Sequence, residues 1–300
     1  MIFPRRLFAG HHAHGGEGVT NGNWVFLAAS GGRQPLVPAS PGFFYAEIMG
    51  PMTTAILSAL PEEQSSLVAL LQAPQRRVHA GRVFWTGMLH GKSVVLALSG
   101  IGKVAAATTA TALIERFGAA RIVFTGVAGG VGDGVRVGDV VVAQDYVQHD
   151  MDASPLFPRW ELPGYARARL ACDVALSALL LEAARACLVS AEGLFDSNNG
   201  HTAQQVHHGL MASGDRFVSA AHESDRLRTA LREAGHDVLA VEMEGAAVAQ
   251  VCLDYGVPFA AVRTISDRAD DAAHGDFALF VQTVASRYAD HMVQTFLQKL

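Results

Sequence analysis

Three carboxylates in this sequence stand at the edges of apolar segments, where acid and base groups can serve a reaction. Glu244 and Asp267 belong to two such segments, residues 241–247 (VEMEGAA) and residues 263–267 (RTISD). Glu63 lies upstream of both and follows a third apolar run. A pair of carboxyl groups can cleave a bond, because one gives a proton to the leaving group while the other takes a proton from water.

Taken one at a time, each acid also has a structural explanation. Glu244 is expected near the start of a helix, where a negative charge complements the helix dipole. Asp267 follows Ser266 and could be a helix N-cap, and Glu63 could be a solvated acid in a first helical turn. All three acids are expected at the carboxyl ends of strands, where ligands of α/β sheets gather, and this shared placement favours a binding site.

The elements that must position these acids alternate between strand and helix patterns from Thr53 onward, which is typical of an α/β domain. We expect strands at residues 54–60, 82–87, 93–99, 121–125, 139–143, 210–213, 238–241 and 257–265. We expect helices at residues 61–71, 104–117, 170–188 and 277–300, and one after residue 244 that has Val248, Val251, Cys252 and Tyr255 on one face. The predicted fold class is α/β, a single three-layer domain with a central mixed twisted sheet flanked by helices.

Two glycine-rich segments resemble nucleotide-binding motifs but fail their requirements. Residues 99–104 (SGIGKV) lack the phosphate-loop pattern, since Ala97 and Val104 stand where that motif needs glycine and a hydroxyl residue. We therefore expect a tight strand-to-helix turn there. Residues 126–134 (GVAGGVGDG) run into another strand instead of opening a crossover helix, so they are not a dinucleotide fingerprint. We expect a loop that lets a ligand approach the backbone closely.

Composition narrows the partners to small molecules. The chain has 300 residues, a formal net charge of −5 and 23 basic residues, which leaves no basic surplus for binding nucleic acid. Three cysteines without C-x-x-C spacing indicate neither a disulfide framework nor a zinc site, and they favour a reducing, cytoplasmic compartment. No apolar run approaches the roughly 20 residues that span a bilayer, so we expect no membrane association.

Residues 1–50 differ from the rest of the chain, because glycines, prolines and histidines are spread through them without a sustained period. The histidines at positions 11, 12 and 14 have no acidic or cysteine companions, so a tail is favoured over a metal site. We expect a poorly structured N-terminal extension at residues 1–50 and one domain at residues 51–300, with no metal and no cofactor.

Seven short motifs follow one another along the chain: residues 60–63 (LPEE), 99–104 (SGIGKV), 126–130 (GVAGG), 137–142 (VGDVVV), 213–217 (SGDRF), 241–244 (VEME) and 266–270 (SDRAD). In this order they resemble the 5′-methylthioadenosine/S-adenosylhomocysteine nucleosidases of the purine nucleoside phosphorylase superfamily. The resemblance implies a nucleoside phosphorylase/hydrolase-like fold and hydrolysis of an N-glycosidic bond, with release of adenine. It also implies a homodimer and a role in methionine salvage.

The resemblance assigns a role to each matching position. Asp267 would protonate the purine at ring position seven, and Glu63 would activate water. Glu244 would accept hydrogen bonds from the ribose hydroxyls. The remaining binding residues implied are Met243 and Gly129 beside the sugar, Phe217 and Val218 at the purine, Arg263 near the water and Glu63, Ser266 beside Asp267, and Ile101 and Phe277 around the 5′ group.

Several positions depart from the family pattern. Val127 stands where a serine is often found in the glycine segment, which removes a hydroxyl beside the ribose and the expected water. Ala153 and Leu156 are substitutions in the wall that a second subunit would lend together with Pro163. Two alternatives stay open at this point: a phosphorylase of the same fold, and a catalytically silent protein that binds or stores nucleosides.

Overall fold

The computed structural model describes residues 52–190, 203–269 and 280–300. The N-terminal extension with its histidines, most of the polar segment around Asn198, and Phe277 lie outside the described residues. The domain boundary expected near residue 50 therefore stays a prediction. None of the described helices is long and apolar enough to cross a membrane.

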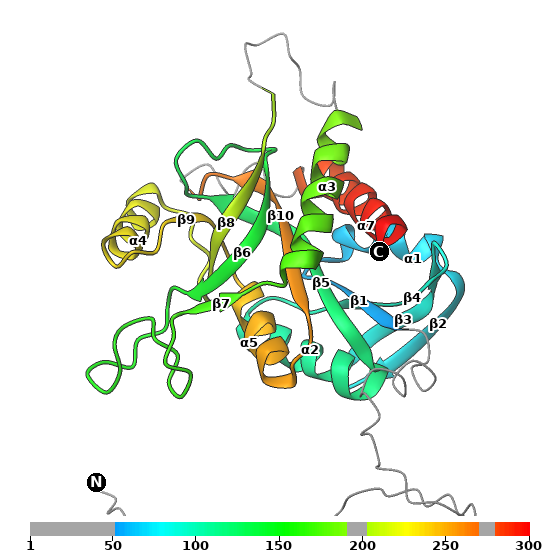
Figure 1. Cartoon of the computed structure of the whole chain (residues 1–300). Helices are drawn as coiled ribbons and strands as arrows, with labels where there is room; N and C mark the ends of the chain where they lie inside the picture. The colour runs from blue at the N-terminus through cyan, green and yellow to red at the C-terminus, as the bar shows by residue number, and fades with distance from the viewer. Residues whose placement is uncertain (1–51, 191–202, 270–279) are drawn as a thin grey trace, which may run out of the picture. The chain divides into compact units, whose positions relative to one another are not determined.

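The described chain forms one mixed sheet with helices on both faces, as the alternating pattern predicted (Figure 1). The strands are β1 (Thr53–Ser58), β2 (Gln72–His79), β3 (Arg82–Leu89), β4 (Lys92–Leu98), β5 (Ala119–Gly130), β6 (Val140–Gln148), β7 (Arg169–Ala171), β8 (Val206–Ser213), β9 (Val238–Glu242) and β10 (Phe259–Asp267). The helices are η1 (Pro61–Glu63), α1 (Ser65–Leu70), α2 (Lys103–Phe117), α3 (Val174–Ser190), α4 (Ala221–Glu233), α5 (Gly245–Tyr255), η3 (Val281–Ala285) and α7 (Ser286–Lys299).

Strand β5 is the centre of this sheet. On one side it pairs in parallel with β1 up to Phe124, and beyond that, at Gly129 and Gly130, it pairs antiparallel with β9. On its other side it pairs in parallel with β10 as far as Gly129. Because β10 pairs with β6, β6 with β8 and β8 with β9, the five strands β5, β10, β6, β8 and β9 close into a ring.

Apolar side chains on the two faces of the sheet hold the helices in place. Helices α2 and α5 cover one face, where small residues such as Ala106, Ala110 and Ala246 let the helices pack closely. Helices α3 and α7 cover the opposite face, with Leu180, Tyr288 and other buried residues between them and the sheet. A smaller cluster lies beneath α4, beside β8 and β9.

Several element predictions were wrong in detail. Residues 126–130 are not a loop but the end of β5, because their ladder with β10 continues through the glycines. The helix expected at 170–188 begins at Val174, after the short strand β7. Tyr255 is exposed, unlike Val248 and Cys252 on the same helix. Strand β2 and helix α4 were not predicted, and both are rich in polar residues.

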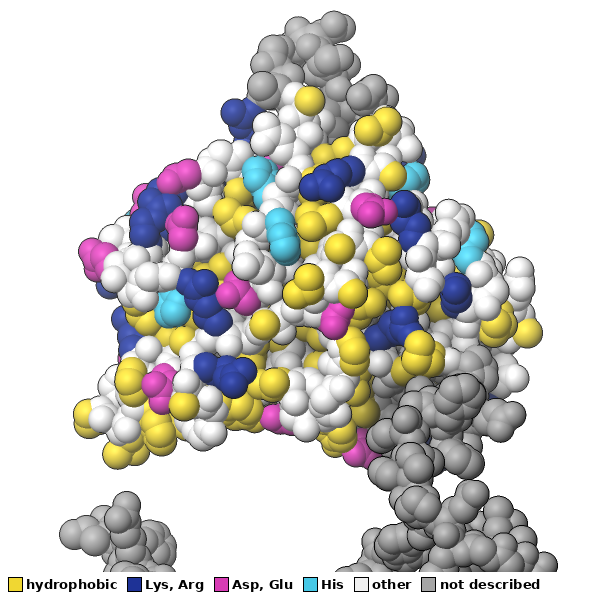
Figure 2. All heavy atoms as spheres, in the orientation of Figure 1, with side chains coloured by type: hydrophobic (Ala, Val, Ile, Leu, Met, Phe, Trp, Pro, Cys, Tyr) yellow, Lys and Arg dark blue, Asp and Glu magenta, His cyan; other side chains and the backbone are white. Residues whose placement is uncertain are grey.

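Charge is mixed over the surface of the described residues. On the face shown in Figure 2, Lys and Arg side chains alternate with Asp and Glu and do not gather into one basic patch. The pairs that Arg228 and Arg232 make with Asp133 and Asp237 are examples of this mixing. The cysteines Cys172, Cys187 and Cys252 are free and buried.

Candidate active site

A cavity of about 180 Å³ opens where β1 and β9 part along the edge of β5. Strand β1 leaves β5 after Phe124 and β9 joins it only at Gly129, so residues between them face the opening. The three parallel strands β1, β5 and β10 all end at this edge. The cavity is therefore at the carboxyl ends of parallel strands, the usual place for a ligand in an α/β sheet.

Glu63 lies at one wall of the cavity, in the short helix η1 that follows β1. Its side chain is buried, and its Oε2 accepts hydrogen bonds from the backbone N–H groups of Ala59 and Leu60, at 2.9 Å each. Its Oε1 is buried without a hydrogen bond in the described structure. Burial raises the pKa of Glu63, although the Leu60 N–H and the charge of Arg263 act in the opposite direction.

Asp267 also lines the cavity, as the last residue of β10. It is not a helix cap, since Ser266 and Asp267 both belong to the strand. Its Oδ1 accepts the Ala269 N–H at 2.7 Å, and its Oδ2 accepts the Ser266 hydroxyl at 2.8 Å. These two donors fix the plane of a buried carboxyl group at the cavity wall.

Two glycines of β5 give these carboxyl groups their space. A Cβ atom on Gly126 would lie 3.1 Å from Oε1 of Glu63, and one on Gly129 would lie 3.0 Å from Oδ1 of Asp267. Both distances are tighter than ordinary van der Waals contact. The glycines therefore serve close approach between backbone and side chains, within a continuous strand.

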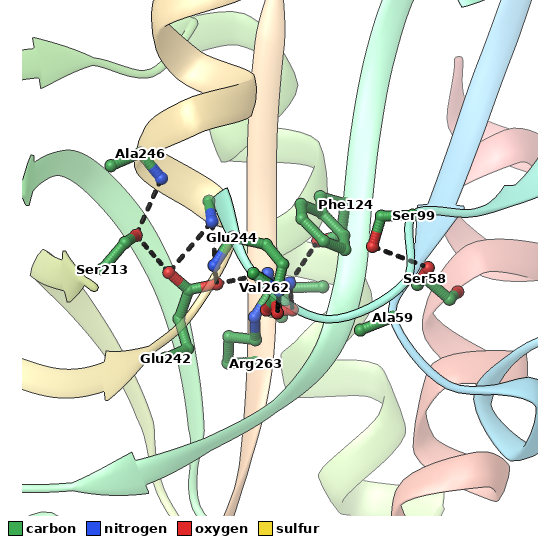
Figure 3. A network of polar contacts seen from close by, with 12 residues as sticks. Ser58, Ala59, Ser99, Phe124, Ser213, Glu242, Glu244, Ala246, Val262 and Arg263 are labelled. Carbon is green, nitrogen blue, oxygen red and sulfur yellow. Dashed lines mark hydrogen bonds and ion pairs between the residues drawn. The ribbon is translucent and has the colours of Figure 1, made fainter. Parts of the chain in front are cut away.

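A buried ion pair in the wall of the cavity joins β9 to β10 and contacts the start of α5 (Figure 3). Nη2 of Arg263 donates to Oε2 of Glu242 at 2.8 Å, and Nη1 donates to the carbonyl oxygen of Phe124 at 3.2 Å. The guanidinium group also lies over the ring of Phe124, 4.0 Å from its centre. Arg263 was expected near the water and Glu63. Its hydrogen bonds in the described structure go to Glu242 and to backbone carbonyls, and its charge acts on Glu63.

Both carboxylate oxygens of Glu242 accept hydrogen bonds from several groups of the protein. Besides Arg263 it accepts the hydroxyl of Ser213 and the backbone N–H of Gly245 at the start of α5, the latter at 3.0 and 2.9 Å to its two oxygens. Each lone-pair direction of Glu242 is thus used inside the protein. It is a structural carboxylate that orients the start of α5, a role that was not predicted from the sequence.

Glu244 has one oxygen held and stands at the N-cap of α5. Its Oε1 accepts the backbone N–H of Gly102 at 2.8 Å, from the turn before α2. Burial, followed by the neighbouring negative charge of Glu242, raises the pKa of Glu244 to about 7. This carboxyl group therefore titrates near neutral pH and can accept or donate a hydrogen bond there.

The mouth of the cavity is lined by apolar side chains. Ile101 is 63% exposed and Phe217 is 40% exposed, whereas Val218 is buried. Met243 is half-buried between Glu242 and Glu244. A ring with a flat apolar face could lie against Phe217, while polar atoms reach the carboxyl groups deeper in the cavity.

Ten of the predicted site residues line this single cavity. They are Glu63, Ile101, Gly129, Phe217, Val218, Met243, Glu244, Arg263, Ser266 and Asp267. Val127 lines it too, with an isopropyl group where a hydroxyl was noted as missing. Ala153, Leu156 and Pro163 are not among the residues that line it. The structure brings the residues together, and the role of each stays a prediction.

The residues that support this site were not predicted from the sequence. Gly126, Gly102 and the backbone of Ala59 and Leu60 act through backbone groups or through a missing side chain, which a search for reactive side chains does not find. Glu242 could have been found, because an acid at the end of an apolar strand must be paired when buried.

Comparison with known proteins agrees with this geometry. Residues 53–298 match the family model of the phosphorylase superfamily. A 5′-methylthioadenosine/S-adenosylhomocysteine nucleosidase of Geobacillus thermodenitrificans is 36% identical over 240 residues, which is 80% of this chain and 94% of the relative.

Solved structures show the same similarity. The nucleosidase from Neisseria meningitidis in complex with methylthio-immucillin-A is 34% identical with a TM-score of 0.73, over 83% of this chain and 100% of that one. The S-adenosylhomocysteine nucleosidase from Streptococcus pyogenes in complex with 5-methylthiotubericidin is 35% identical with a TM-score of 0.72, over 84% and 99% of the two chains.

Proposed function

Because this chain belongs to the 5′-methylthioadenosine/S-adenosylhomocysteine nucleosidases of the phosphorylase superfamily, we propose that it hydrolyses the N-glycosidic bond of these two nucleosides. The products are adenine and the 5′-thio-substituted ribose, which fits a role in methionine salvage. The observation that carries the proposal is the placement of two buried carboxyl groups, Glu63 and Asp267, in the lining of one cavity.

Asp267 acts as the acid in this proposal. As the bond between C1′ and N9 breaks, its electron pair moves into the purine, and Asp267 delivers a proton to N7 to neutralise the charge. Ser266 and the Ala269 N–H hold the carboxyl group by 2.8 and 2.7 Å hydrogen bonds, so the proton is presented in a fixed direction. Gly129 leaves the space for that orientation.

Glu63 acts as the base. Water attacks C1′ of the developing oxocarbenium ion, and Glu63 takes the proton that water loses. Two backbone donors hold its Oε2, which leaves Oε1 to accept a hydrogen bond from water. Burial raises the pKa of Glu63 and so makes its carboxylate a stronger base than an exposed glutamate.

The other cavity residues bind the nucleoside. Glu244 accepts hydrogen bonds from the ribose hydroxyls and Met243 packs against the sugar. The purine stacks on Phe217 while the backbone of Val218 reads its edge. Ile101 contacts the 5′ substituent, together with Phe277 from outside the described residues. Arg263 lowers the pKa of Glu63 by its charge, from its place beside Glu242.

The charges of the cavity favour hydrolysis over phosphorolysis. Among its described lining residues the cationic side chains are Arg216 and Arg263, and Arg263 is already bound to Glu242. A phosphate ion at the attacking position would meet the carboxylate of Glu63, and like charges at close range in a buried site repel strongly. Water, which is neutral, meets no such barrier.

A substrate panel tests the proposal directly. The panel is 5′-methylthioadenosine, S-adenosylhomocysteine, 5′-deoxyadenosine, adenosine and inosine, each with and without added phosphate, and adenine or hypoxanthine release is measured. We expect adenine from the two thio-substituted nucleosides without phosphate. Release that requires phosphate would make the protein a phosphorylase, and tight calorimetric binding without release would make it a binding protein.

A homodimer is part of the proposal. Three apolar side chains are more than 60% exposed: Ile101 in the turn before α2, Val104 in the first turn of α2, and Leu156 in the loop after β6. A second subunit would cover them and lend Ala153, Leu156 and Pro163 to the wall around the 5′ group. Light scattering should give twice the mass of the chain, and Leu156→Glu should reduce it to one. The free, buried cysteines fit a cytoplasmic location.

A further inference from the structure

Lys103 links the turn before α2 to two other loops around the cavity mouth. Its Nζ pairs with Oδ1 of Asp150 at 2.6 Å and donates to the side-chain oxygen of Gln148 at 3.0 Å. Its backbone N–H donates to Oδ1 of Asp215 at 2.7 Å. The side chain is 18% exposed, so this ion pair is partly shielded from solvent.

Asp150 and Asp215 complete a closed ring of contacts with Lys103. Oδ2 of Asp150 accepts the backbone N–H of Asp215 at 2.9 Å, while its Oδ1 faces Lys103. The carboxylate of Asp215 in turn accepts the Lys103 N–H. Three chain segments that lie far apart in sequence are thereby fixed to one another.

None of these three residues lines the cavity, yet Lys103 and Asp215 are close in sequence to residues that do, and Asp150 joins these two. Ile101 is two residues before Lys103, and Phe217 is two residues after Asp215, and both are at the mouth. Gly102, directly before Lys103, donates its N–H to Oε1 of Glu244. Gly102 has φ of +96°, and a Cβ there would lie 3.1 Å from Oδ1 of Asp215.

We propose that Lys103, Asp150 and Asp215 form a positioning clamp that fixes the Gly102 N–H on Glu244 and sets the distance between Ile101 and Phe217. With Oε1 of Glu244 occupied by Gly102, its other oxygen is directed to the ribose. The clamp thus acts on nucleoside binding through Glu244 and the two apolar residues. The inference rests on the proposed function, because the nucleoside is the ligand that these groups would hold.

The clamp also bears on the protonation of Glu244. The Gly102 N–H stabilises the ionised form, against burial and the negative charges of Glu242 and Glu63, while Arg263 acts in the same direction as Gly102. Releasing the turn removes this donor and raises the pKa of Glu244. A protein without the clamp should therefore need a higher pH to reach full kcat/KM.

Asp215→Ala is the variant that opens the ring, and Asp215→Asn is its conservative partner, since an amide oxygen can still accept the Lys103 N–H. We expect Asp215→Ala to raise KM for 5′-methylthioadenosine at least tenfold with a smaller change in kcat. We also expect it to move the acid limb of kcat/KM to higher pH. Asp215→Asn should have a KM and an acid limb of kcat/KM close to those of the unaltered protein.

The matched control is Glu182→Ala, which removes an ion pair of similar length with Lys299, at 2.7 Å and away from the cavity. It should leave KM and the pH profile unchanged. The clamp is refuted if Asp215→Ala keeps a normal KM and acid limb, or if Asp215→Asn is as impaired as Asp215→Ala.

Calorimetry with 5′-methylthioadenosine separates the two proposals. If the unaltered protein binds the nucleoside but releases no adenine, the proposed function fails while the clamp is still measured as weaker binding in Asp215→Ala. Thermal unfolding of each variant shows whether the fold is retained. A folded Asp215→Ala protein that binds the nucleoside with unchanged affinity overturns the clamp.

Discussion

The carboxyl groups around the cavity differ in what already binds them, and this separates their roles. Glu242 has its oxygens taken by Arg263, Ser213 and the start of α5. Glu244 has one oxygen held by Gly102, and Glu63 has one buried oxygen without a hydrogen bond in the described structure. A carboxylate that is saturated by the protein supports structure, and one with a free oxygen is available to a ligand or to water.

Asp267→Asn tests whether Asp267 is the proton donor. The amide keeps the shape of the side chain but has no acidic proton to give to the purine, so we expect kcat to fall by at least 10²-fold, while nucleoside binding remains measurable by calorimetry. Turnover within a few fold of the unaltered protein would show that another group protonates the base.

Glu63→Gln and the dependence of kcat on pH both test whether Glu63 is the base. A base must be ionised, and the raised pKa of Glu63 means that its carboxylate is lost at a higher pH than for an exposed glutamate. We expect kcat to fall on the acid side of neutrality in the unaltered protein. Glu63→Gln should lose hydrolysis at every pH, and a variant that stays active would reassign the base.

Glu244→Gln should change how stability depends on pH. The folded pKa is about 7 against an ordinary value of 4.5, so the folded state binds the proton more tightly. That contribution is fully present below about pH 4.5 and is lost as the pH rises through 7, which amounts to roughly 3 kcal/mol. The free energy of unfolding in urea, measured at pH 5 and at pH 8, should fall less between these two pH values in Glu244→Gln than in the unaltered protein. An equal fall in both proteins would contradict the raised pKa of Glu244.

Strand β5 is both a central strand of the sheet and part of the cavity wall. Its ladder with β10 runs through Ala128 and Gly129, so the backbone is held by hydrogen bonds right up to the cavity. Meanwhile its other edge is free of a partner between Phe124 and Gly129 in the described structure. A site built on a paired strand is held more precisely than one built on a loop.

Gly129→Ala tests this use of the strand. The added methyl would lie 3.0 Å from Oδ1 of Asp267 and from Cβ of Ala269, so the carboxyl group must move. We expect kcat to fall tenfold or more. The double variant with Asp267→Asn is the control: if Gly129 acts through Asp267, the two losses should not add, whereas additive losses would indicate an independent effect.

The elements around the site were predictable where apolar patterns are strong. Strand β10 and helix α2 followed from buried runs and from the glycine turn at residues 99–104. Strand β2 was missed because all of its residues are exposed, so burial leaves no alternating pattern. The glycines of β5 misled the prediction, since glycine favours loops unless a neighbouring side chain requires close approach.

The acids of the site could be predicted as a set, but their surroundings could not. Glu63 and Asp267 stand at the ends of β1 and β10, and the carboxyl ends of these parallel strands meet at one edge. Glu244 follows β9, which pairs antiparallel with β5, and it lines the same cavity. By contrast, the bond from Gly102 to Glu244 joins residues 142 positions apart, and it depends on how α2 and α5 pack. Patterns within a short window of sequence carry no information about such contacts.

Removing the first 48 residues tests whether the N-terminal extension contributes to stability or activity. The sheet begins at Thr53, and the family match covers residues 53–298, so a chain that starts at Met49 holds every described element. We expect its melting temperature to stay within about 2 °C and its kcat/KM to stay within twofold of the full chain. A large loss of either would give residues 1–48 a part in the fold or the site.

The ring that β5 closes with β10, β6, β8 and β9 determines when during folding the site can exist. Strand β10 is the last of the described strands, and it must enter between β5 and β6 before Asp267 can line the same cavity as Glu63. Contacts between such distant residues form late, since long loops must close first. On the ribosome, a growing chain would therefore complete its sheet and its site only after β10 has been synthesised, so cleavage of nucleosides by unfinished chains is not expected.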